Sequence, residues 1–352
     1  MGASGRTSFR SLCLISALSL SAGLAAPSFA TTKPDWTLNS TQSVVTFEDA
    51  LRAYDAKNYD LALANAKIAA TAGNDEAMVL AGNMLMNGEA GIINDKEAAD
   101  WFRQAASFGN TDAQVLLGKM ALKSRGGLMP ADALAYFSQA SQAGRTDARR
   151  AIGEMYQKGI GIAKDPEKAK VWLRQSADAG DISGARKMGD SLIETDPKSA
   201  LQWYEKAADA GDAEAAYIAA VMYAENLDIR PNGRKAAMLM RQAAESGIAG
   251  AQADYGLLVY QGAGVERDID AAADWFKRSA NGGDSEGQFL YAFTLAKGEG
   301  VPQNFEDAYF WLLKSGESGV DDYDTDRKVL RKRLEDNVDQ AVLMRARNRA
   351  GL

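Results

Sequence analysis

Residues 151–180 read AIGEMYQKGIGIAKDPEKAKVWLRQSADAG, and residues 200–211 repeat the ending of that stretch as ALQWYEKAADAG. The glycine that closes each stretch belongs to a series along the chain: Gly73, Gly109, Gly144, Gly180, Gly211, Gly247, Gly283 and Gly319. Its members are separated by 36, 35, 36, 31, 36, 36 and 36 residues. A period of this length is typical of an array in which each unit packs on its neighbours.

Small side chains precede every glycine of the series at fixed distances. An alanine lies eleven residues before each one, at Ala62, Ala98, Ala133, Ala169, Ala200, Ala236, Ala272 and Ala308, and an Ala or Ser lies four residues before it. These spacings fall on one face of an α-helix, where small side chains let a neighbouring helix approach closely. We expect the adjacent volume to be filled by the aromatic residue eight positions before the glycine: Trp101, Tyr136, Trp172, Trp203, Trp275 and Trp311.

A second helix is predicted after each glycine, so each unit is a helix pair. The glycine suits a helix end because it adopts the left-handed conformation, and Asp165-Pro166 and Asp196-Pro197 suit helix beginnings. The sequence therefore predicts an all-α solenoid of tandem helix-turn-helix repeats. Its eight units are 46–76, 77–112, 113–147, 148–183, 184–214, 215–250, 251–286 and 287–322, preceded by a linker, 31–45, and followed by a capping helix in 323–352.

The pattern resembles a known repeat. Written as Ala-x-x-x-Leu-Gly-x-x-Tyr-x-x-Gly-x-Gly-Val, then Asp or Asn, Ala, two aromatic residues and Ala-Ala-x-x-Gly, it resembles the Sel1-like repeat, a relative of the tetratricopeptide repeat, over residues 46 to 322. The first unit, FEDALRAYDAKNYDLALANAKIAATAG at 47–73, departs toward the tetratricopeptide form. The resemblance implies a right-handed superhelix that works as an adaptor. Exported bacterial members include regulators of membrane-bound signalling kinases, cell-envelope assembly factors and host-interaction proteins.

The first 30 residues indicate export. Arg6 and Arg10 precede an apolar run of about 15 residues, and Ala30 closes a small-residue cleavage site, so the mature chain is expected to begin near Thr31, in the periplasm. A retained membrane anchor is the alternative, but the apolar run is shorter than the ~20 residues that span a bilayer. Cys13 is the chain's one cysteine, so the mature protein has no disulfide and must be stabilised by packing.

Charge is distributed unevenly along the chain. Residues 327 to 349 contain eight Lys or Arg and three acidic residues, a balance of +5, whereas residues 31 to 326 carry −14. The negative charge of residues 31 to 326 argues against nucleic acid as a partner, because nucleic-acid binding depends on basic residues that neutralise phosphates. The basic segment is predicted to form one amphipathic helix, with Leu330, Leu334, Val338 and Ala341 on its apolar stripe. We expect it to cap the last repeat, and contact with anionic lipid or an acidic partner is a second interpretation.

Several kinds of chemistry are excluded by composition. The chain has no histidine and the mature chain no cysteine, which removes the commonest general base, the commonest metal ligand and thiol catalysis. The Gly-x-Gly turns at Gly159, Gly262 and Gly298 lack the third glycine of a dinucleotide site. The acidic run 322–326 is followed by Arg327 where a calcium loop needs glycine. We therefore predict a protein without enzymatic activity, cofactor or metal.

A partner-binding surface is predicted on the first helix of each pair, because in the tetratricopeptide relatives that helix lines the concave groove. Its third, seventh and tenth positions are polar in the middle units, as at Arg150, Glu154 and Arg186, and become apolar toward the end of the chain. The predicted binding residues are Tyr217, Val221, Leu257, Tyr260, Phe289 and Phe293. An exposed apolar patch of this kind is typical of an interaction site.

Two alternatives stay open for this surface. The six side chains either face the groove, or belong to the core or lie under the C-terminal segment. If they face the groove, the partner is a protein or peptide, such as a membrane-bound signalling or envelope protein, or alternatively an envelope glycan or lipid, since aromatic faces suit peptides and sugar rings equally.

Overall fold

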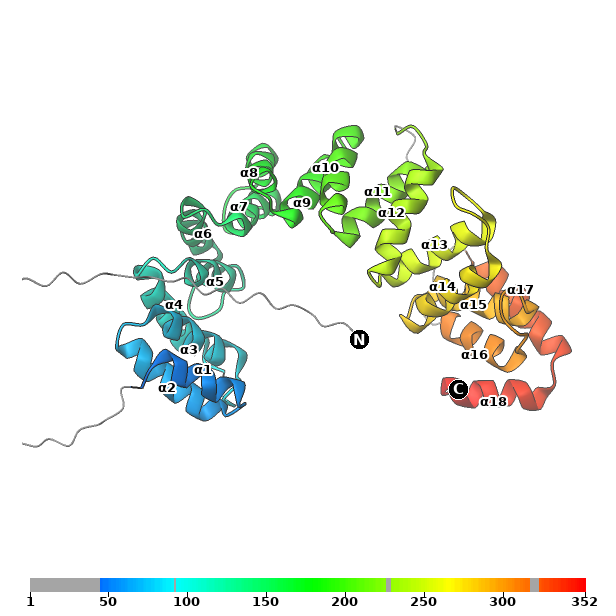
Figure 1. Cartoon of the computed structure of the whole chain (residues 1–352), viewed down its shortest axis with the longest axis horizontal. Helices are drawn as coiled ribbons and strands as arrows, with labels where there is room; N and C mark the ends of the chain where they lie inside the picture. The colour runs from blue at the N-terminus through cyan, green and yellow to red at the C-terminus, as the bar shows by residue number, and fades with distance from the viewer. Residues whose placement is uncertain (1–44, 92, 226–228, 317–322) are drawn as a thin grey trace, which may run out of the picture. The chain divides into compact units, whose positions relative to one another are not determined.

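The computed structural model describes residues 45–91, 93–225, 229–316 and 323–352 (Figure 1). The predicted signal peptide and nearly all of the predicted linker lie outside these ranges. The described residues form eighteen α-helices and one 3-10 turn at Pro130–Asp132, with no strand among them. The helices are α1 (Phe47–Asp55), α2 (Tyr59–Thr71), α3 (Asp75–Asn87), α4 (Asp95–Ser107), α5 (Thr111–Leu122), α6 (Ala133–Gln142), α7 (Thr146–Lys158), α8 (Pro166–Asp178), α9 (Ile182–Leu192), α10 (Pro197–Asp209), α11 (Ala213–Glu225), α12 (Gly233–Glu245), α13 (Ala249–Gln261), α14 (Ile269–Asn281), α15 (Ser285–Lys297), α16 (Phe305–Ser315), α17 (Asp324–Asn337) and α18 (Gln340–Ala350).

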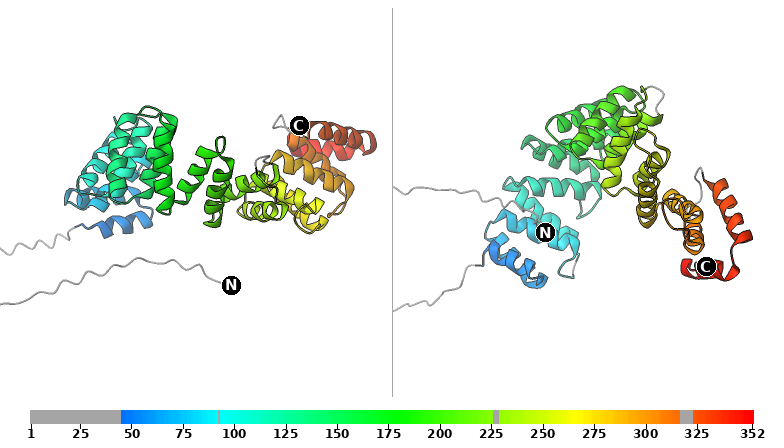
Figure 2. Two further views of the ribbon diagram at one scale, coloured as in Figure 1. Left: turned by 90° about the horizontal axis from the view of Figure 1, so that it is seen from above. Right: turned by 45° about the vertical axis from the view of Figure 1, so that its right-hand side comes forward.

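Consecutive helices pack in pairs, from α1 with α2 to α15 with α16, and each pair packs on the next (Figures 1 and 2). The first helices of neighbouring pairs also contact each other, as α7 contacts α9 and α13 contacts α15. The predicted all-α solenoid is confirmed. From α3 onward, however, each first helix begins two residues before the predicted start of its unit, as α3 does at Asp75, whereas α1 begins at Phe47, one residue after its predicted start.

The helix ends follow from local chemistry. The Asn74 side chain accepts a hydrogen bond from the Ala77 amide and begins α3, and Asp165 caps α8 in the same way with Pro166 in the first turn. At the other end, Gly73 has a φ of 97°, directly after the last residues of α2. A Cβ on Gly73 would have nothing within 4 Å, so the position needs glycine for its backbone conformation and not for space.

The core is built differently from the sequence-based expectation. The tryptophans eight positions before each glycine are only half-buried, and the residue after each of them fills the space between the paired helices. These fully buried residues are Phe102, Phe137, Leu173, Tyr204 and Phe276. They press against glycines of the first helices: a Cβ on Gly82 would lie 2.5 Å from the Phe102 ring. The first-helix glycine is therefore needed for close helix packing.

The C-terminal segment contains two helices where one was predicted. The chain is extended at Val338, and the Asp339 side chain accepts a hydrogen bond from the Ala341 amide at the start of α18. The predicted apolar stripe fails at this break, because Ala341 is exposed while Leu343 and Ala346 are completely buried. Asp339 can begin a new helix because its carboxylate satisfies an amide that the break leaves without a helical partner. Helix α18 packs on α16, at the end of the repeat array.

Candidate functional site

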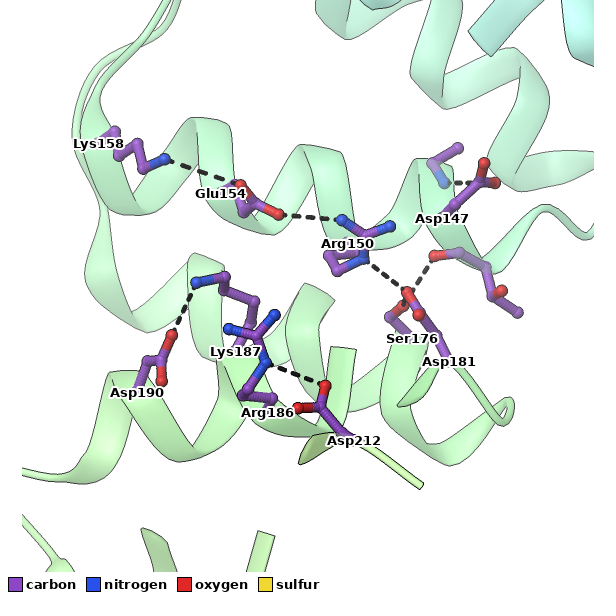
Figure 3. Close-up of polar contacts among 12 residues, drawn as sticks. Asp147, Arg150, Glu154, Lys158, Ser176, Asp181, Arg186, Lys187, Asp190 and Asp212 are labelled. Atoms are coloured by element: carbon purple, nitrogen blue, oxygen red, sulfur yellow. Dashed lines mark hydrogen bonds and ion pairs between the residues drawn. The ribbon is translucent and has the colours of Figure 1, made fainter. Parts of the chain in front are cut away.

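The first helices carry two chemically different regions. We call the first the charge ladder, formed by Arg150, Glu154, Asp181, Arg186 and Asp212 (Figure 3). Arg150 on α7 donates to Asp181 at 2.9 Å and to Glu154 at 3.3 Å, and Arg186 on α9 donates to Asp212 at 3.0 Å. Each arginine is the third residue of its predicted unit, one of the three positions expected to face the groove. It pairs with an aspartate that directly precedes the next first helix. The ladder therefore ties successive repeats together.

The ladder satisfies its own charges. Burial opposes ionisation of Arg150, yet its pKa lies above the usual value because Asp181 and Glu154 stabilise the guanidinium. Asp190 on α9 pairs with Lys187 at 2.8 Å (Figure 3). It also accepts a hydrogen bond from the Tyr204 hydroxyl at 2.9 Å. Charged groups that are already paired gain little binding free energy from a ligand. We therefore interpret the charge ladder as a structural contact between neighbouring repeats.

The predicted binding residues lie in the second region, where the structure places them in two pockets. Tyr217 and Val221 line the first, which we call the α11 pocket; its volume is ≈ 330 Å³. The other lining residues are Ile193, Ile218, Met222 and Glu225. Both α11 side chains are half-buried, which leaves part of each accessible to a ligand.

The remaining four predicted residues meet in the α15 pocket, of ≈ 460 Å³. Leu257 and Tyr260 reach it from α13, and Phe289 and Phe293 from α15. Gln261 on α13 and Leu290 on α15 also line it, and the C-terminal segment adds Tyr323, directly before α17, and Asp326, Val329, Leu330 and Arg333 on α17. Both volumes lie within the range of small-ligand and side-chain pockets, roughly 300–1,000 Å³.

Phe289 differs from the other five residues because the C-terminal segment covers it. Its ring is 4% exposed and lies 5.1 Å from the Tyr323 ring, and the Arg327 guanidinium lies over it at 5.6 Å. The covered alternative thus describes Phe289, while the other five predicted residues remain half-exposed. Sequence spacing could not separate these cases, because the covering residues Tyr323 and Arg327 lie 34 and 38 positions further along the chain.

In each pocket a carboxylate accepts a hydrogen bond from the hydroxyl of a predicted binding tyrosine, Tyr217 or Tyr260. The Tyr217 hydroxyl donates to Asp254 on α13 at 2.9 Å, and the Tyr260 hydroxyl donates to Glu299 at 2.6 Å. Burial, followed by the negative charge of Asp254, raises the pKa of Tyr217 above its usual value. Because the hydroxyls are already bonded, the flat ring faces are what the tyrosines offer to a ligand.

Asp254 is a site residue that the sequence analysis did not identify. Burial raises the pKa of its carboxyl, Asp284 and Glu225 add to that effect by repulsion, and the Tyr217 hydroxyl partly opposes it. The described part of the chain contains no Lys or Arg paired with it. A signal was present in the sequence: the other first helices hold no acidic residue at the same position, as Leu116 and Ile218 illustrate.

The basic residues of α18 are largely occupied. Arg345 pairs with Glu306 at 2.7 Å, Arg349 pairs with Asp307 at 2.8 Å, and Arg347 pairs with Glu335 at 3.3 Å. These pairs fasten α18 to α16 and α17. Arg345 and Arg349 are exposed but paired, whereas the exposed basic side chains without an ion pair among the described residues lie on α17, at Lys328, Lys332 and Arg333. Contact with anionic lipid stays a prediction. Among the described residues, no helix is long and apolar enough to cross a membrane, and no cluster of acidic residues is suited to hold a metal ion.

Comparison with known proteins decides the family. The Sel1 repeat matches seven times, at residues 75–110, 111–144, 146–181, 185–212, 213–248, 249–284 and 285–320. The chain belongs to the Sel1 repeat family. These matches confirm the resemblance inferred from the glycine series, and they begin after the first helix pair, whose sequence departs toward the tetratricopeptide form. Sel1 repeat proteins generally act as protein-interaction scaffolds, and their fold is typically non-catalytic.

Solved structures of other Sel1 repeat proteins resemble this one. A Sel1 repeat protein from Oxalobacter formigenes is 24% identical, with 82% of this chain and 84% of that chain covered and a TM-score of 0.67. A protective antigen present in uropathogenic Escherichia coli strains is 22% identical, with 86% and 82% covered and a TM-score of 0.38. A comparison with curated proteins found no match. The first of these likenesses shows the same fold.

Proposed function

We propose that this Sel1 repeat protein is an exported scaffold that binds a segment of another protein across the α11 and α15 pockets. One observation carries the proposal: five partly exposed side chains, three of them aromatic, gather in two pockets on successive first helices, directly after the charge ladder, whose arginines and carboxylates pair with one another. Aromatic side chains in such pockets are favoured anchors for protein partners. A membrane-bound signalling protein or an envelope-assembly protein is the class of partner that we expect.

The proposal is tested by photocrosslinking in the native envelope. A photoreactive amino acid at Val221 or Phe293 should give an adduct with a protein, whereas the same group at Met238, 57% exposed on the second helix α12, should not. Equal adducts at Val221 and Met238, or none at Val221 and Phe293, would contradict the proposed surface. An adduct that resists protease and carries a glycan or lipid mass would favour an envelope glycan or lipid as the ligand.

Export is tested separately. It rests on the order of basic, apolar and small residues in the first 30 positions. Intact-mass measurement of protein from the native host should show a chain that begins close to Thr31 and is recovered from the periplasm. Full-length protein in the cytosolic fraction would contradict export without bearing on the pockets.

A further inference from the structure

The α11 pocket has a composition that suits a side chain with an apolar stem and a charged tip. Ile193, Ile218 and Met222 provide apolar lining, and Glu225 contributes a carboxylate at the last residue of α11. Tyr217 connects this lining to a second carboxylate, because its hydroxyl donates to Asp254. An aliphatic stem would pack on the apolar residues while a cationic tip approached the carboxylates.

Asp254 has no paired cation among the described residues and lies within α13, whereas the aspartates of the charge ladder directly precede their helices, where α13 has Ile248. In the charge ladder, Asp181 and Asp212 each pair with an arginine of the preceding first helix. The residue equivalent to those arginines on α11 is Tyr217, which supplies a hydrogen bond but no positive charge. Asp254 is therefore half-buried without a cation, an arrangement that costs stability. A half-buried carboxylate of this kind is a candidate for ligand recognition.

The chain itself shows how an arginine binds to a first helix of this region. Arg327 lies over the ring of Phe289, which occupies on α15 the position that Tyr217 occupies on α11. The same side chain donates to the Ser285 hydroxyl at 3.0 Å and pairs with Asp324 at 3.4 Å. An arginine packed on an aromatic ring beside polar oxygens is thus a contact already present at the α15 pocket.

We infer that the α11 pocket binds an arginine or lysine side chain of the partner, with the stem against Tyr217 and Val221 and the charged tip toward Glu225 and Asp254. The inference rests on the proposed function and specifies the chemistry of its partner as a basic segment. The net charge of −14 over residues 31 to 326 favours the approach of such a segment. The charge ladder cannot offer the same site, because its own arginines already occupy its carboxylates.

The test uses the mature full chain and an array of short amphipathic peptides that differ only in their central residue: arginine, lysine, citrulline, leucine or glutamate. Citrulline keeps the shape of arginine and lacks its charge. Arginine and lysine peptides should bind about tenfold more tightly than citrulline peptides, because a hydrogen bond to a charged group is stronger than a neutral one by about this factor in affinity. Added salt should reduce the preference, because it screens the charges.

Three variants test whether the preference for basic peptides arises in the α11 pocket. Asp254→Asn keeps an oxygen that can accept from Tyr217 and removes the charge, so it should abolish most of the preference. Asp274→Asn makes the same change at an exposed position on α14 and should leave the preference intact. Val221→Lys places a cationic side chain inside the pocket and should block all the peptides.

The outcomes separate the inference from the proposed function. If arginine and citrulline peptides bind equally and Val221→Lys blocks both, the docking surface stands and its preference for basic side chains is refuted. Preferential binding of glutamate peptides, an unchanged preference in Asp254→Asn, or failure of every peptide to bind would also overturn the inference. Crosslinking in the native envelope reports on the docking surface independently of all these peptides.

Discussion

The helix pairs α7 to α10 and the helices α11 to α15 are built on the same backbone pattern, yet they present opposite chemistry at the same helix positions. In the former, Arg150 and Arg186 occupy the third position and bind carboxylates of the next repeat. In the latter, Tyr217 and Phe289 stand at that position and line apolar pockets. A repeat can therefore use one position either to pair with its neighbour or to line an apolar pocket.

The largest effect on stability is expected when the C-terminal helices α17 and α18, which cover the last repeat, are removed. Deletion after Asp326 should expose Tyr309 and Leu313, which are buried at the end of the array, and should uncover the α15 pocket. An uncovered repeat face in water is unfavourable, so we expect aggregation or a Tm lower by about 10 °C or more. Thermal unfolding and size-exclusion chromatography measure this. A truncated protein that stays monomeric and equally stable would show that α17 and α18 are a functional tail and not a cap.

The next largest contrast is between core and pocket aromatics. Phe276→Ala should cost about 3–5 kcal/mol of stability, because its buried ring fills the space against Gly256, whereas Phe293→Ala should cost about 1 kcal/mol or less. Phe289→Ala should resemble the core variant, because Tyr323 and Arg327 cover that ring. Chemical denaturation of the three variants gives the order, and a Phe293→Ala as destabilising as Phe276→Ala would place Phe293 in the core.

Within the charge ladder, Arg186→Met should lower stability by about 1–2 kcal/mol. The variant leaves Asp212, a carboxylate only 11% exposed, without its ion pair. Combining it with Asp212→Asn should restore most of the loss, since asparagine can still accept the hydrogen bond from the Ala215 amide. A double-mutant cycle measures the coupling, and additive losses would contradict the role of the pair as a clamp.

The smallest expected effect concerns Asp254. Because the folded-state pKa of Asp254 is raised, the folded protein holds its proton more tightly than the unfolded chain, and this carboxylate lowers stability at neutral pH. Asp254→Asn should therefore raise Tm by about 1–3 °C at pH 7. The difference from the wild type should shrink as the pH falls through the raised pKa, because wild-type Asp254 becomes neutral. A Tm lowered by Asp254→Asn at pH 7 would mean that the charge stabilises the fold.

Much of the architecture was predictable because it depends on spacing alone. The glycine series, the alanines eleven residues earlier and the Asp-Pro turns determine helix pairs, and the family matches confirm them. The six predicted binding residues follow from the same register, which is why they were found on the first helices, in two pockets. Spacing was less reliable for exact positions: it assigned the core to Trp101 and its equivalents, when the next residue along is the one that turns fully inward.

What the sequence by itself determined is the local and periodic part of this protein, because helix caps, small-residue faces and repeat length act over a few residues or one repeat. Only the tertiary structure decided which side chains are paired, covered or left accessible. The ion pairs of Arg150 and Arg186, the Tyr217–Asp254 bond and the contact of Tyr323 with Phe289 each join residues 26 to 37 positions apart. Such contacts follow from how neighbouring repeats pack, and the packing sets the partner of each charge.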